Sequence, residues 1–389
     1  MRNCRTILLV CAAIAGATLL SGCQKIGVKN PYAGQAIRFA AGSRGTQSTK
    51  TVYGGDYEKE NTVYQALNWK VNDMITIASE QAEVQNVGGN ASDYKVTKVV
   101  EGVPSTATVV NADVNGLMWS ENESVTNYQF YAAYPAVGTE RTNLTLTAKG
   151  AFSATIPSTQ SLVGQPEEKT DPKGDASISY KVYAPEMVFA YMTAAASIKI
   201  DENTTTENAT VKLPFAPAFT AFEFYVSSQD EEIALTEFEL VSPEKNDDYP
   251  GFVQDKLAGT FSMTAGDNST VSASDAGSSI KVDLSSTDAI DATHGLSFTV
   301  FTVPVTNQSP LRIKFTSKDG ENATKTSYLD LKYSKNEAAG ANAGKAFQFQ
   351  AGHKYRIHML KLPSSQWRIT ITADFDEWVD AQEEVVIYI

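Results

Sequence analysis

The sequence predicts an all-β protein with two antiparallel β-sandwich domains behind an N-terminal export signal. Most of its apolar segments alternate apolar and polar residues with a period of two, as half-buried strands do. Turn signals such as Gly54-Gly55 and Asp319-Gly320 separate these segments. No segment keeps a helical period beyond about two turns. Many short strands at this spacing are typical of β-sandwiches.

Residues 1–22 have the layout of a signal peptide. Arg2 and Arg5 give a basic start, and the apolar run from Ile7 to Leu20 is too short to span a bilayer. Ser21 and Gly22 stand directly before Cys23, which is the arrangement of a lipoprotein signal. We therefore expect cleavage before Cys23 and lipidation of that cysteine. The alternative is an ordinary signal peptide that contains a cysteine.

The mature chain would then hold no thiol available for a disulfide. Cys4 and Cys11 lie in the removed segment, and Cys23 is consumed by the lipid. Gln24 rather than Asp follows the cysteine, which favours sorting to the outer membrane. We expect an envelope protein that is stabilised by buried apolar area and hydrogen bonds.

The charge balance excludes nucleic acid as a partner. The chain has 32 Lys and Arg against 45 Asp and Glu, and a formal net charge of −13. Nucleic-acid binding needs a concentrated basic face. An acidic surface instead suits a soluble extracellular domain.

Residues 23–34 contain Gly, Asn and Pro and are expected to be a flexible tether. The N-terminal domain is then predicted over residues 35–195. Its candidate strands, in order, are Ala36–Ala40, Leu67–Ala78, Tyr94–Val100, Asn127–Tyr134, Leu144–Ala148 and Phe152–Ile156. The polar stretch Gln160–Ala176 is predicted to be a long exposed loop.

The C-terminal domain is predicted over residues 196–389, after the small residues Ala194-Ala195-Ala196. Its candidate strands are Thr210–Leu213, Ala221–Val226, Leu235–Val241, Gly259–Thr264, Ile280–Leu284, Leu296–Val303, Leu311–Thr316, Ser327–Tyr333, Tyr355–Leu362, Trp367–Phe375 and Glu384–Ile389. Asn336–Gly344 is rich in Ala, Gly and Asn and is predicted to be a loop.

No residue pattern indicates catalysis, a metal site or a cofactor. His353 and His358 have opposite parity on neighbouring strand positions, so we expect them on opposite faces. The acidic residues from Asp374 to Glu384 lack the glycine and the ligand spacing of a calcium loop. The sequence has no nucleophile elbow and no phosphate loop. A carboxylate pair for glycoside hydrolysis leaves no local signature and stays open.

The two ends of the chain are more informative. The polar stretch after the first strand contains Arg44 and Lys50, with Arg38 in the strand itself, and a trypsin-like protease could cut there. An ordinary hairpin loop explains it equally well. At the other end, the strand Val385, Val386, Ile387, Tyr388 and Ile389 is apolar on both faces. Such a strand must pair within its own sheet or with a partner's sheet.

Several segments together resemble the fimbrillins, the subunits of type V pili of Gram-negative anaerobes. The resemblance covers about Ile37 to Trp367. It is carried by Trp69 with Asp73 and Ile75, Tyr128–Pro135, Phe152–Gln160, Pro185–Ala190, Phe215–Phe224, Leu257–Ser262 and Phe349–Tyr355. Each segment is a strand with a turn, and their order and spacing make the resemblance specific.

The resemblance implies two transthyretin-like β-sandwich domains and a lipidated precursor that reaches the outer membrane. It implies that a trypsin-like surface protease cuts after a basic residue and removes the first strand. On this sequence the removed strand would be Ala36, Ile37, Arg38, Phe39 and Ala40, and the cut would follow Arg44, with Arg38 or Lys50 as less favoured sites. A neighbouring subunit's C-terminal strand, Val385 to Ile389, would then fill the vacated groove.

The leading hypothesis is a non-enzymatic pilus subunit that serves cell adhesion, with other pilus subunits as partners and no cofactor. Whether it is a stalk, tip or anchor subunit stays open. The alternative is a monomeric glycan-binding lipoprotein of the outer membrane, in which Tyr53, Tyr57, Tyr64 and Trp378 stack on sugars. An envelope hydrolase is the third possibility.

Overall fold

The computed structural model describes residues 29–43, 50–59, 62–100, 106–112, 115–170, 177–229, 232–244, 254–274, 277–307, 309–318, 323–332, 346–363 and 367–373. Over these ranges every regular element is a β-strand, apart from one 3-10 turn, η1 (Met187–Phe189). The all-β prediction is confirmed. None of the residues in these ranges forms a helix that is long and apolar enough to cross a membrane.

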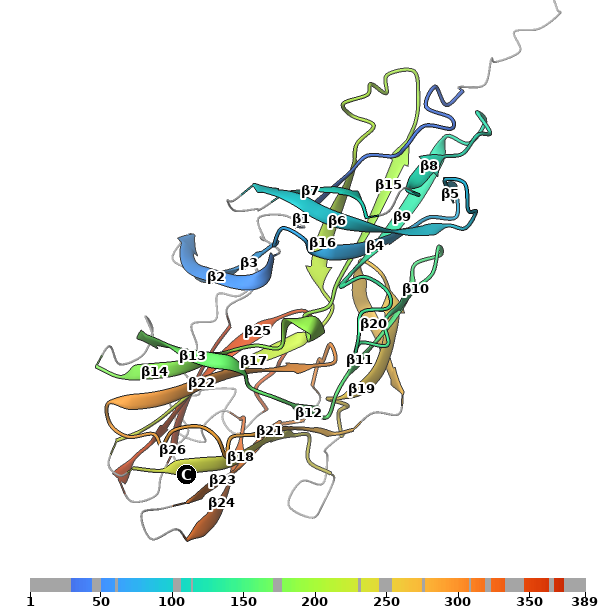
Figure 1. The fold of residues 1–389 in the computed structure, drawn as a ribbon. Coiled ribbons are helices and arrows are strands. Elements are labelled where there is room, and N and C mark those ends of the chain that lie inside the picture. Colours follow the sequence, from blue (N-terminus) through green and yellow to red (C-terminus); the bar gives the residue numbers. More distant parts are fainter. Residues whose placement is uncertain are drawn as a thin grey trace, which may run out of the picture.

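A closed β-barrel occupies the upper part of the molecule in Figure 1. Its strands, in order around the barrel, are β1 (Phe39–Ser43), β16 (Val211–Pro217), β15 (Met192–Lys199), β9 (Asn127–Tyr134), β4 (Met74–Ala78), β6 (Ala91–Val100) and β7 (Thr106–Asn111). Neighbouring strands are antiparallel, except that β1 and β16 run parallel. Two two-stranded sheets accompany the barrel: β2 (Lys50–Lys59) with β3 (Thr62–Asn68), and β5 (Ala82–Val84) with β8 (Leu117–Trp119).

Three further sheets form the rest of the described structure (Figure 1). The four-stranded sheet has the order β10 (Thr145–Leu146), β11 (Ala151–Ile156), β19 (Gly259–Thr264) and β20 (Asp267–Ser274). The five-stranded sheet has the order β12 (Thr159–Gln160), β21 (Ser279–Asp283), β18 (Ala234–Val241), β23 (Arg312–Lys318) and β24 (Thr324–Asp330). The six-stranded sheet has the order β13 (Val163–Thr170), β14 (Ser179–Ala184), β22 (His294–Thr302), β17 (Thr220–Ser228), β25 (Lys354–Lys361) and β26 (Trp367–Ala373).

The five- and six-stranded sheets pack face to face as a β-sandwich. Phe238 of β18 lies with its ring centroid 4.5 Å from that of Phe224 and 5.0 Å from that of Phe298, both on the six-stranded sheet. Phe315 of β23 contacts Trp367 of β26 at 4.5 Å. Aromatic side chains that alternate inward on both sheets therefore form this core. A second, separate apolar core fills the barrel.

One carboxylate and two cations lie buried on the other face of the six-stranded sheet. Glu223 Oε2 is 3.0 Å from Lys354 Nζ and 3.0 Å from Arg356 Nε. Burial by itself raises the pKa of the Glu223 carboxyl, but the two cations outweigh it and hold that pKa below its ordinary value. This cluster ties the central strands β17 and β25 together, which pair in parallel with Glu223 opposite Arg356.

The two cores do not divide the chain at one point. The segment from β10 to β14 leaves the barrel strand β9 and adds strands to all three lower sheets. The chain then returns to the barrel with β15 and β16 before it enters the sandwich. Where the sequence predicts an N-terminal sandwich, the strands close into a barrel because β1 bridges β7 and β16. The division into domains at residue 195 stays a prediction.

Two predicted boundaries differ from the structure. Gln160–Ala176 is not wholly a loop, because β13 occupies Val163–Thr170 and pairs with β14. β13 is an edge strand whose side chains are almost all exposed, so it has no apolar face for a period-two pattern to reveal. The predicted strand Leu67–Ala78 is interrupted by a turn in which Asn72 has a φ of 81°.

Close backbone contacts join the barrel to the four-stranded sheet. A Cβ atom on Gly150 would lie 2.4 Å from the Tyr131 ring of β9, and one on Gly266 would lie 2.7 Å from Ala195 of β15. Both glycines have positive φ values, 83° and 78°. A larger residue would displace the Tyr131 ring at Gly150 and the backbone of β15 at Gly266.

Gly150→Ala should therefore destabilise the protein more than Gly138→Ala does. Gly138 has nearly the same φ, 85°, but nothing lies within 4 Å of the Cβ it lacks. The backbone cost of about 1–2 kcal/mol is shared by both variants, and overpacking adds about 1–3 kcal/mol at Gly150 alone. Urea unfolding of both variants measures the difference. Equal losses would mean that the contact with Tyr131 yields freely.

Candidate functional site: strand β1 and the gap it fills

β1 is a short strand with one face in the barrel core. Phe39 and Ala41 are buried, whereas Ala40 and Gly42 are partly exposed. Successive side chains of a strand point to opposite sides, so this alternation suits the wall of a packed barrel.

Backbone pairing holds β1 on both sides. Phe39 lies opposite Val211 and Ser43 opposite Phe215 in the parallel pairing with β16. On the other side Phe39 lies opposite Val109 in the antiparallel pairing with β7. Since β7 and β16 meet only through β1 in the barrel order, this strand is the element that closes the barrel.

The Phe39 side chain occupies the centre of an aromatic cluster. Its ring centroid lies 5.1 Å from that of Tyr94 and 5.3 Å from that of Phe130, edge-on in both cases. Ala41 is completely buried further along the strand. Loss of β1 without a replacement would open a cavity at Phe39, and deletion of such a side chain costs about 3–5 kcal/mol.

The strand predicted to be removable, Ala36–Ala40, overlaps β1 but begins earlier. Ile37 donates its backbone N–H to the Leu117 carbonyl at 2.9 Å, and Ala36 forms an isolated bridge with Met118. Residues 36 and 37 therefore lie alongside β8. The barrel strand starts at Phe39 and continues to Ser43. The period-two pattern continues across this change of partner, so it could not mark the boundary.

The structure places two of the three predicted processing residues. Arg38 is exposed, and its carbonyl accepts the Val211 N–H at 2.9 Å. Lys50 is the first residue of β2. Arg44 follows Ser43 directly and lies outside the described residues. A cut after Arg38 would leave β1 on the downstream part of the chain, whereas a cut after Arg44 or Lys50 would put all of β1 on the upstream fragment.

Other predicted site residues lie outside the described ranges. These are the lipidation residue Cys23 and the donor-strand residues Val385, Val386, Ile387, Tyr388 and Ile389. Of the predicted tether, residues 29–34 are described, and hydrogen bonds attach them to the barrel instead of leaving them loose.

Two buried tyrosines lie near the N-terminal segment: Tyr94 contacts Phe39 of β1, and Tyr128 contacts Asn30 upstream of β1. Burial raises the pKa of Tyr94 to about 12, although the Leu117 N–H donates to its hydroxyl at 2.8 Å and opposes the shift. Burial also raises the pKa of Tyr128, against the hydrogen bonds from Asn30 and Ser120. Both phenols are neutral at physiological pH, and each acts as a fixed hydrogen-bonding group in the wall of the barrel.

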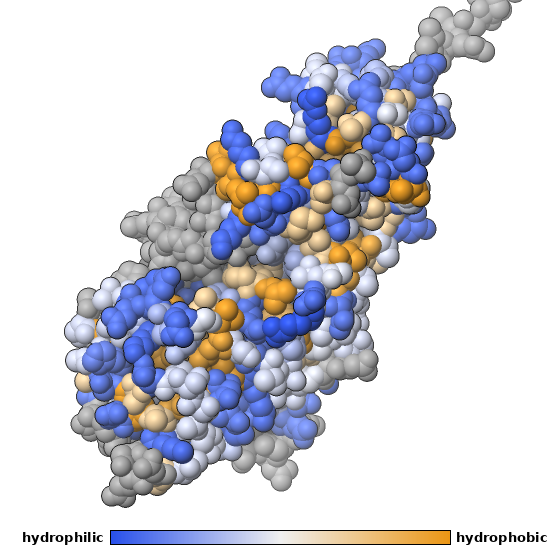
Figure 2. All heavy atoms as spheres, viewed as in Figure 1, coloured by the Kyte–Doolittle hydropathy of each residue, from blue (hydrophilic) through white to orange (hydrophobic). Residues whose placement is uncertain are grey.

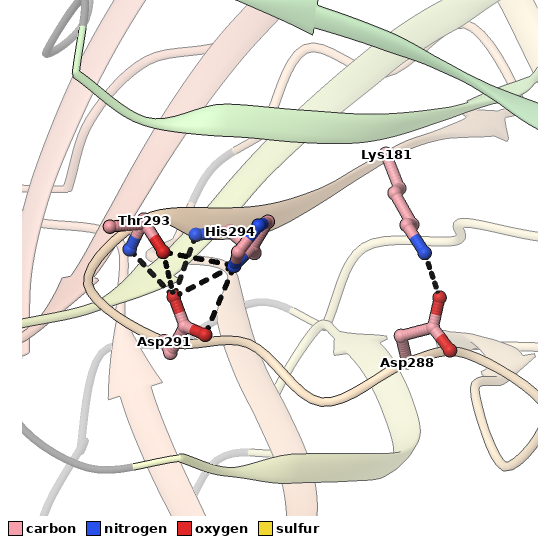
Figure 3. A network of polar contacts seen from close by, with 5 residues as sticks. All are labelled: Lys181, Asp288, Asp291, Thr293 and His294. Carbon is pink, nitrogen blue, oxygen red and sulfur yellow. Dashed lines mark hydrogen bonds and ion pairs between the residues drawn. The ribbon is translucent and has the colours of Figure 1, made fainter.

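A polar cluster near β22 does not have the geometry of a hydrolase site (Figure 3). Thr293 Oγ1 lies 2.9 Å from His294 Nδ1, and Asp291 Oδ2 lies 3.1 Å from the same nitrogen. A catalytic triad places the acid and the nucleophile on different ring nitrogens, which this cluster does not. The Thr293 N–H and the His294 side chain instead hold the pKa of the Asp291 carboxyl well below its usual range. Asp291 thus caps an exposed turn beside the ion pair of Lys181 with Asp288.

The histidines offer no metal site in the part of the chain that the structure describes, where no group of three His, Cys, Asp or Glu side chains could hold an ion. His358 stacks on Tyr225 with ring centroids 5.2 Å apart.

Figure 2 shows a mostly hydrophilic face with apolar residues in small groups, in keeping with the acidic composition.

Of the two strands that flank β1, the sequence prediction missed β7 and located only part of β16. β7 carries a period-two pattern, with Ala107 and Val109 buried between exposed residues, which could have revealed it as a strand. β16 was predicted in part, as Thr210–Leu213. No local signal shows that β16 pairs in parallel with β1, because the partners lie far apart in sequence.

No family model and no curated protein matches the chain. Solved structures of cell adhesion and fimbrial proteins match across most of its length. One, described as a "putative cell adhesion protein" from Bacteroides uniformis, is 13% identical, with a TM-score of 0.47, and the match covers 88% of this chain and 99% of that one. A fimbrial assembly protein from Parabacteroides distasonis is 10% identical, with a TM-score of 0.36 over 87% of this chain and 98% of its own.

The tip fimbrial protein Mfa3 from Porphyromonas gingivalis, with a C-terminal truncation, is 9% identical, with a TM-score of 0.38 over 87% of this chain and 98% of its own. TM-scores below 0.5 do not establish a common fold. The function of this chain is therefore argued from its own residues.

Tyr94 predicts a loss of stability at alkaline pH. Its pKa rises from the ordinary tyrosine value of 10.0 to about 12 in the folded protein. Stability from the neutral phenol is thus complete below pH 10 and is lost as the pH rises through 12, by up to about 3 kcal/mol. Denaturant unfolding between pH 9 and pH 12 should show this decline, with a smaller slope in Tyr94→Phe. An unchanged slope in that variant would assign the decline to other tyrosines.

Proposed function

We propose that this chain is a structural subunit of a cell-surface fimbria that serves adhesion and is assembled by protease-triggered strand exchange. The observation that carries the proposal is the position of β1. This strand closes the barrel, and it is joined to β2 through a stretch that contains Arg44 and ends at Lys50. One cut in this stretch would separate the closing strand from the rest of the fold.

The chemistry of the vacated gap supports strand exchange. Loss of β1 would expose the backbone groups of β7 and β16 that now pair with it, together with the apolar floor beneath Phe39 and Ala41. Each buried backbone group without a partner costs about 1–3 kcal/mol. An extended apolar strand from another subunit would restore the hydrogen bonds and bury roughly 25 cal/mol of free energy per Å² of apolar surface.

The chain ends supply the other parts of the proposal. The signal sequence before Cys23 would bring a lipidated precursor to the outer membrane, and the segment Val385–Ile389 would be the donated strand. Removal of β1 would also detach the lipid, since Cys23 lies on the same upstream fragment. The partners are then other pilus subunits, and the resemblance to fimbrillins points in the same direction.

Cleavage should trigger assembly. We expect an Arg-specific protease to cut the recombinant chain after Arg44, so that the new N-terminus is Gly45, and polymers should then appear on a gel of unheated samples. Arg44→Ala should prevent both events, whereas Arg38→Ala should prevent neither, because Arg38 precedes β1. N-terminal sequencing identifies the cut. Polymers formed equally by uncut protein would contradict the proposal.

Deletion of Glu384–Ile389 should give a subunit that accepts a strand but donates none. Mixed with cleaved wild-type protein, it should shorten the polymers in proportion to its share of the mixture, because it ends each chain that it joins. A synthetic peptide of residues 384–389 should shorten them as well, by occupying the gap. If the deleted subunit forms long polymers alone, another segment is the donor. If it stays monomeric and binds glycans on an array, as wild type does, the glycan-binding alternative gains support.

A further inference from the structure

The segment upstream of β1 is bound to a second surface, outside the barrel gap. It runs along β8, where the Ile37 N–H donates to the Leu117 carbonyl at 2.9 Å and the Gly34 N–H donates to the Trp119 carbonyl at 3.0 Å. The Trp119 N–H donates in return to the Gln35 carbonyl at 2.9 Å. Residues 34–37 therefore lie against β8, which pairs with β5 in a separate two-stranded sheet.

The upstream end of this segment is fixed by a buried side chain. Asn30 is only 2% exposed, and its Nδ2 donates to the Tyr128 hydroxyl at 3.0 Å. The same hydroxyl accepts the Ser120 N–H at 3.2 Å. The Asn30 N–H donates to the Glu123 carbonyl at 2.7 Å, and Asn30 Oδ1 accepts the Tyr32 N–H at 2.9 Å. Three polar groups of Asn30 are thus satisfied inside the protein.

Other contacts of the segment add less. The Lys29–Glu123 ion pair is exposed at both side chains, and such pairs contribute little. The Tyr32 hydroxyl donates to the Thr204 carbonyl at 2.9 Å. We call the contacts of residues 29–37 with β8, Tyr128, Glu123 and Thr204 the clamp.

We infer that the clamp is a second binding site for the leader, residues 29–43, and that it keeps the cut leader bound to the subunit until another strand displaces it. The inference rests on the proposed cleavage between β1 and β2. A cut after Arg44 frees the Ser43 end of β1 and leaves the clamp untouched at the opposite end of the leader. An incoming strand then enters the gap from the Ser43 end, and the contacts of Asn30 are the last to release the leader.

The clamp also differs from the gap in its chemistry. β1 fills its gap with the apolar side chains of Phe39 and Ala41. The clamp instead uses a buried hydrogen bond from the Asn30 amide to the Tyr128 hydroxyl. A buried polar group that loses its partner costs about 1–3 kcal/mol. Loss of the Asn30 side chain should therefore speed the escape of the cut leader by roughly 5- to 150-fold.

The test uses the chain from Gln24 without Glu384–Ile389, so that polymers do not form during the measurement. After cleavage with an Arg-specific protease, size-exclusion chromatography in native buffer followed by mass spectrometry should find the leader in the protein peak. The leader should separate in urea. Asn30→Ala should lose it roughly 5- to 150-fold faster. Gln348→Ala is the matched control, because its side chain lies outside the clamp and contacts the Ala346 carbonyl in an exposed bond of 3.5 Å.

A peptide experiment avoids any folding defect of the variants. A labelled peptide of residues 29–43 should exchange into cleaved protein without Glu384–Ile389 and bind at least about tenfold more tightly than a peptide of residues 38–43, which keeps β1 but lacks the clamp. A leader that elutes separately at once, or equal affinities of the two peptides, would overturn the inference. Retention of the leader without any later assembly of the full chain would leave the clamp in place and refute the fimbrial function instead.

Discussion

The barrel depends on one pairing, that of β1 between β7 and β16. Every other neighbouring pair in the barrel is antiparallel, and the parallel pairing of β1 with β16 joins residues that are distant in sequence. A closed barrel has no sheet edge, which removes the most aggregation-prone feature of a β protein. Without β1 the same fold would have two facing edges and an open apolar core, so the barrel requires a strand at this position.

The gap does not require that this strand belong to the same chain. Backbone pairing holds β1 on both sides, and any extended segment can supply it, whereas the Phe39 and Ala41 positions favour apolar side chains. The covalent link to β2 contributes nothing to the ladder itself. A fold of this kind is complete only with a short strand that can in principle be exchanged.

The sequence predicted the class of structure well because alternation records burial directly. β9 and β11 alternate buried and partly buried positions along most of their length, and both were located from the sequence. β13 was missed because an exposed edge strand buries almost nothing. Alternation also does not identify the strand with which a segment pairs. The run from Ala36 to Ser43 has one continuous alternating pattern, yet it pairs first with β8 and then with β7 and β16.

The candidate site illustrates the same limit from the side of function. The basic stretch with Arg44 and the apolar terminal strand could be recognised locally, because charge and hydropathy are properties of single residues. The Asn30–Tyr128 bond could not, because it joins residues 98 positions apart in a segment whose composition suggests a loose tether. A single contact between two distant segments leaves no periodic pattern in the sequence of either segment.

Cleavage itself can supply the driving force for exchange. The leader and an incoming strand make the same backbone bonds in the gap, so those terms largely cancel. Before the cut, a short connection holds the leader near its site at an effective concentration of about 1 mM. After the cut, a leader that escapes is diluted by its surroundings, and each tenfold dilution corresponds to about 1.4 kcal/mol. A single peptide bond would thus separate a stable precursor from a subunit that exchanges its closing strand in one direction, while the clamp sets how fast the leader leaves.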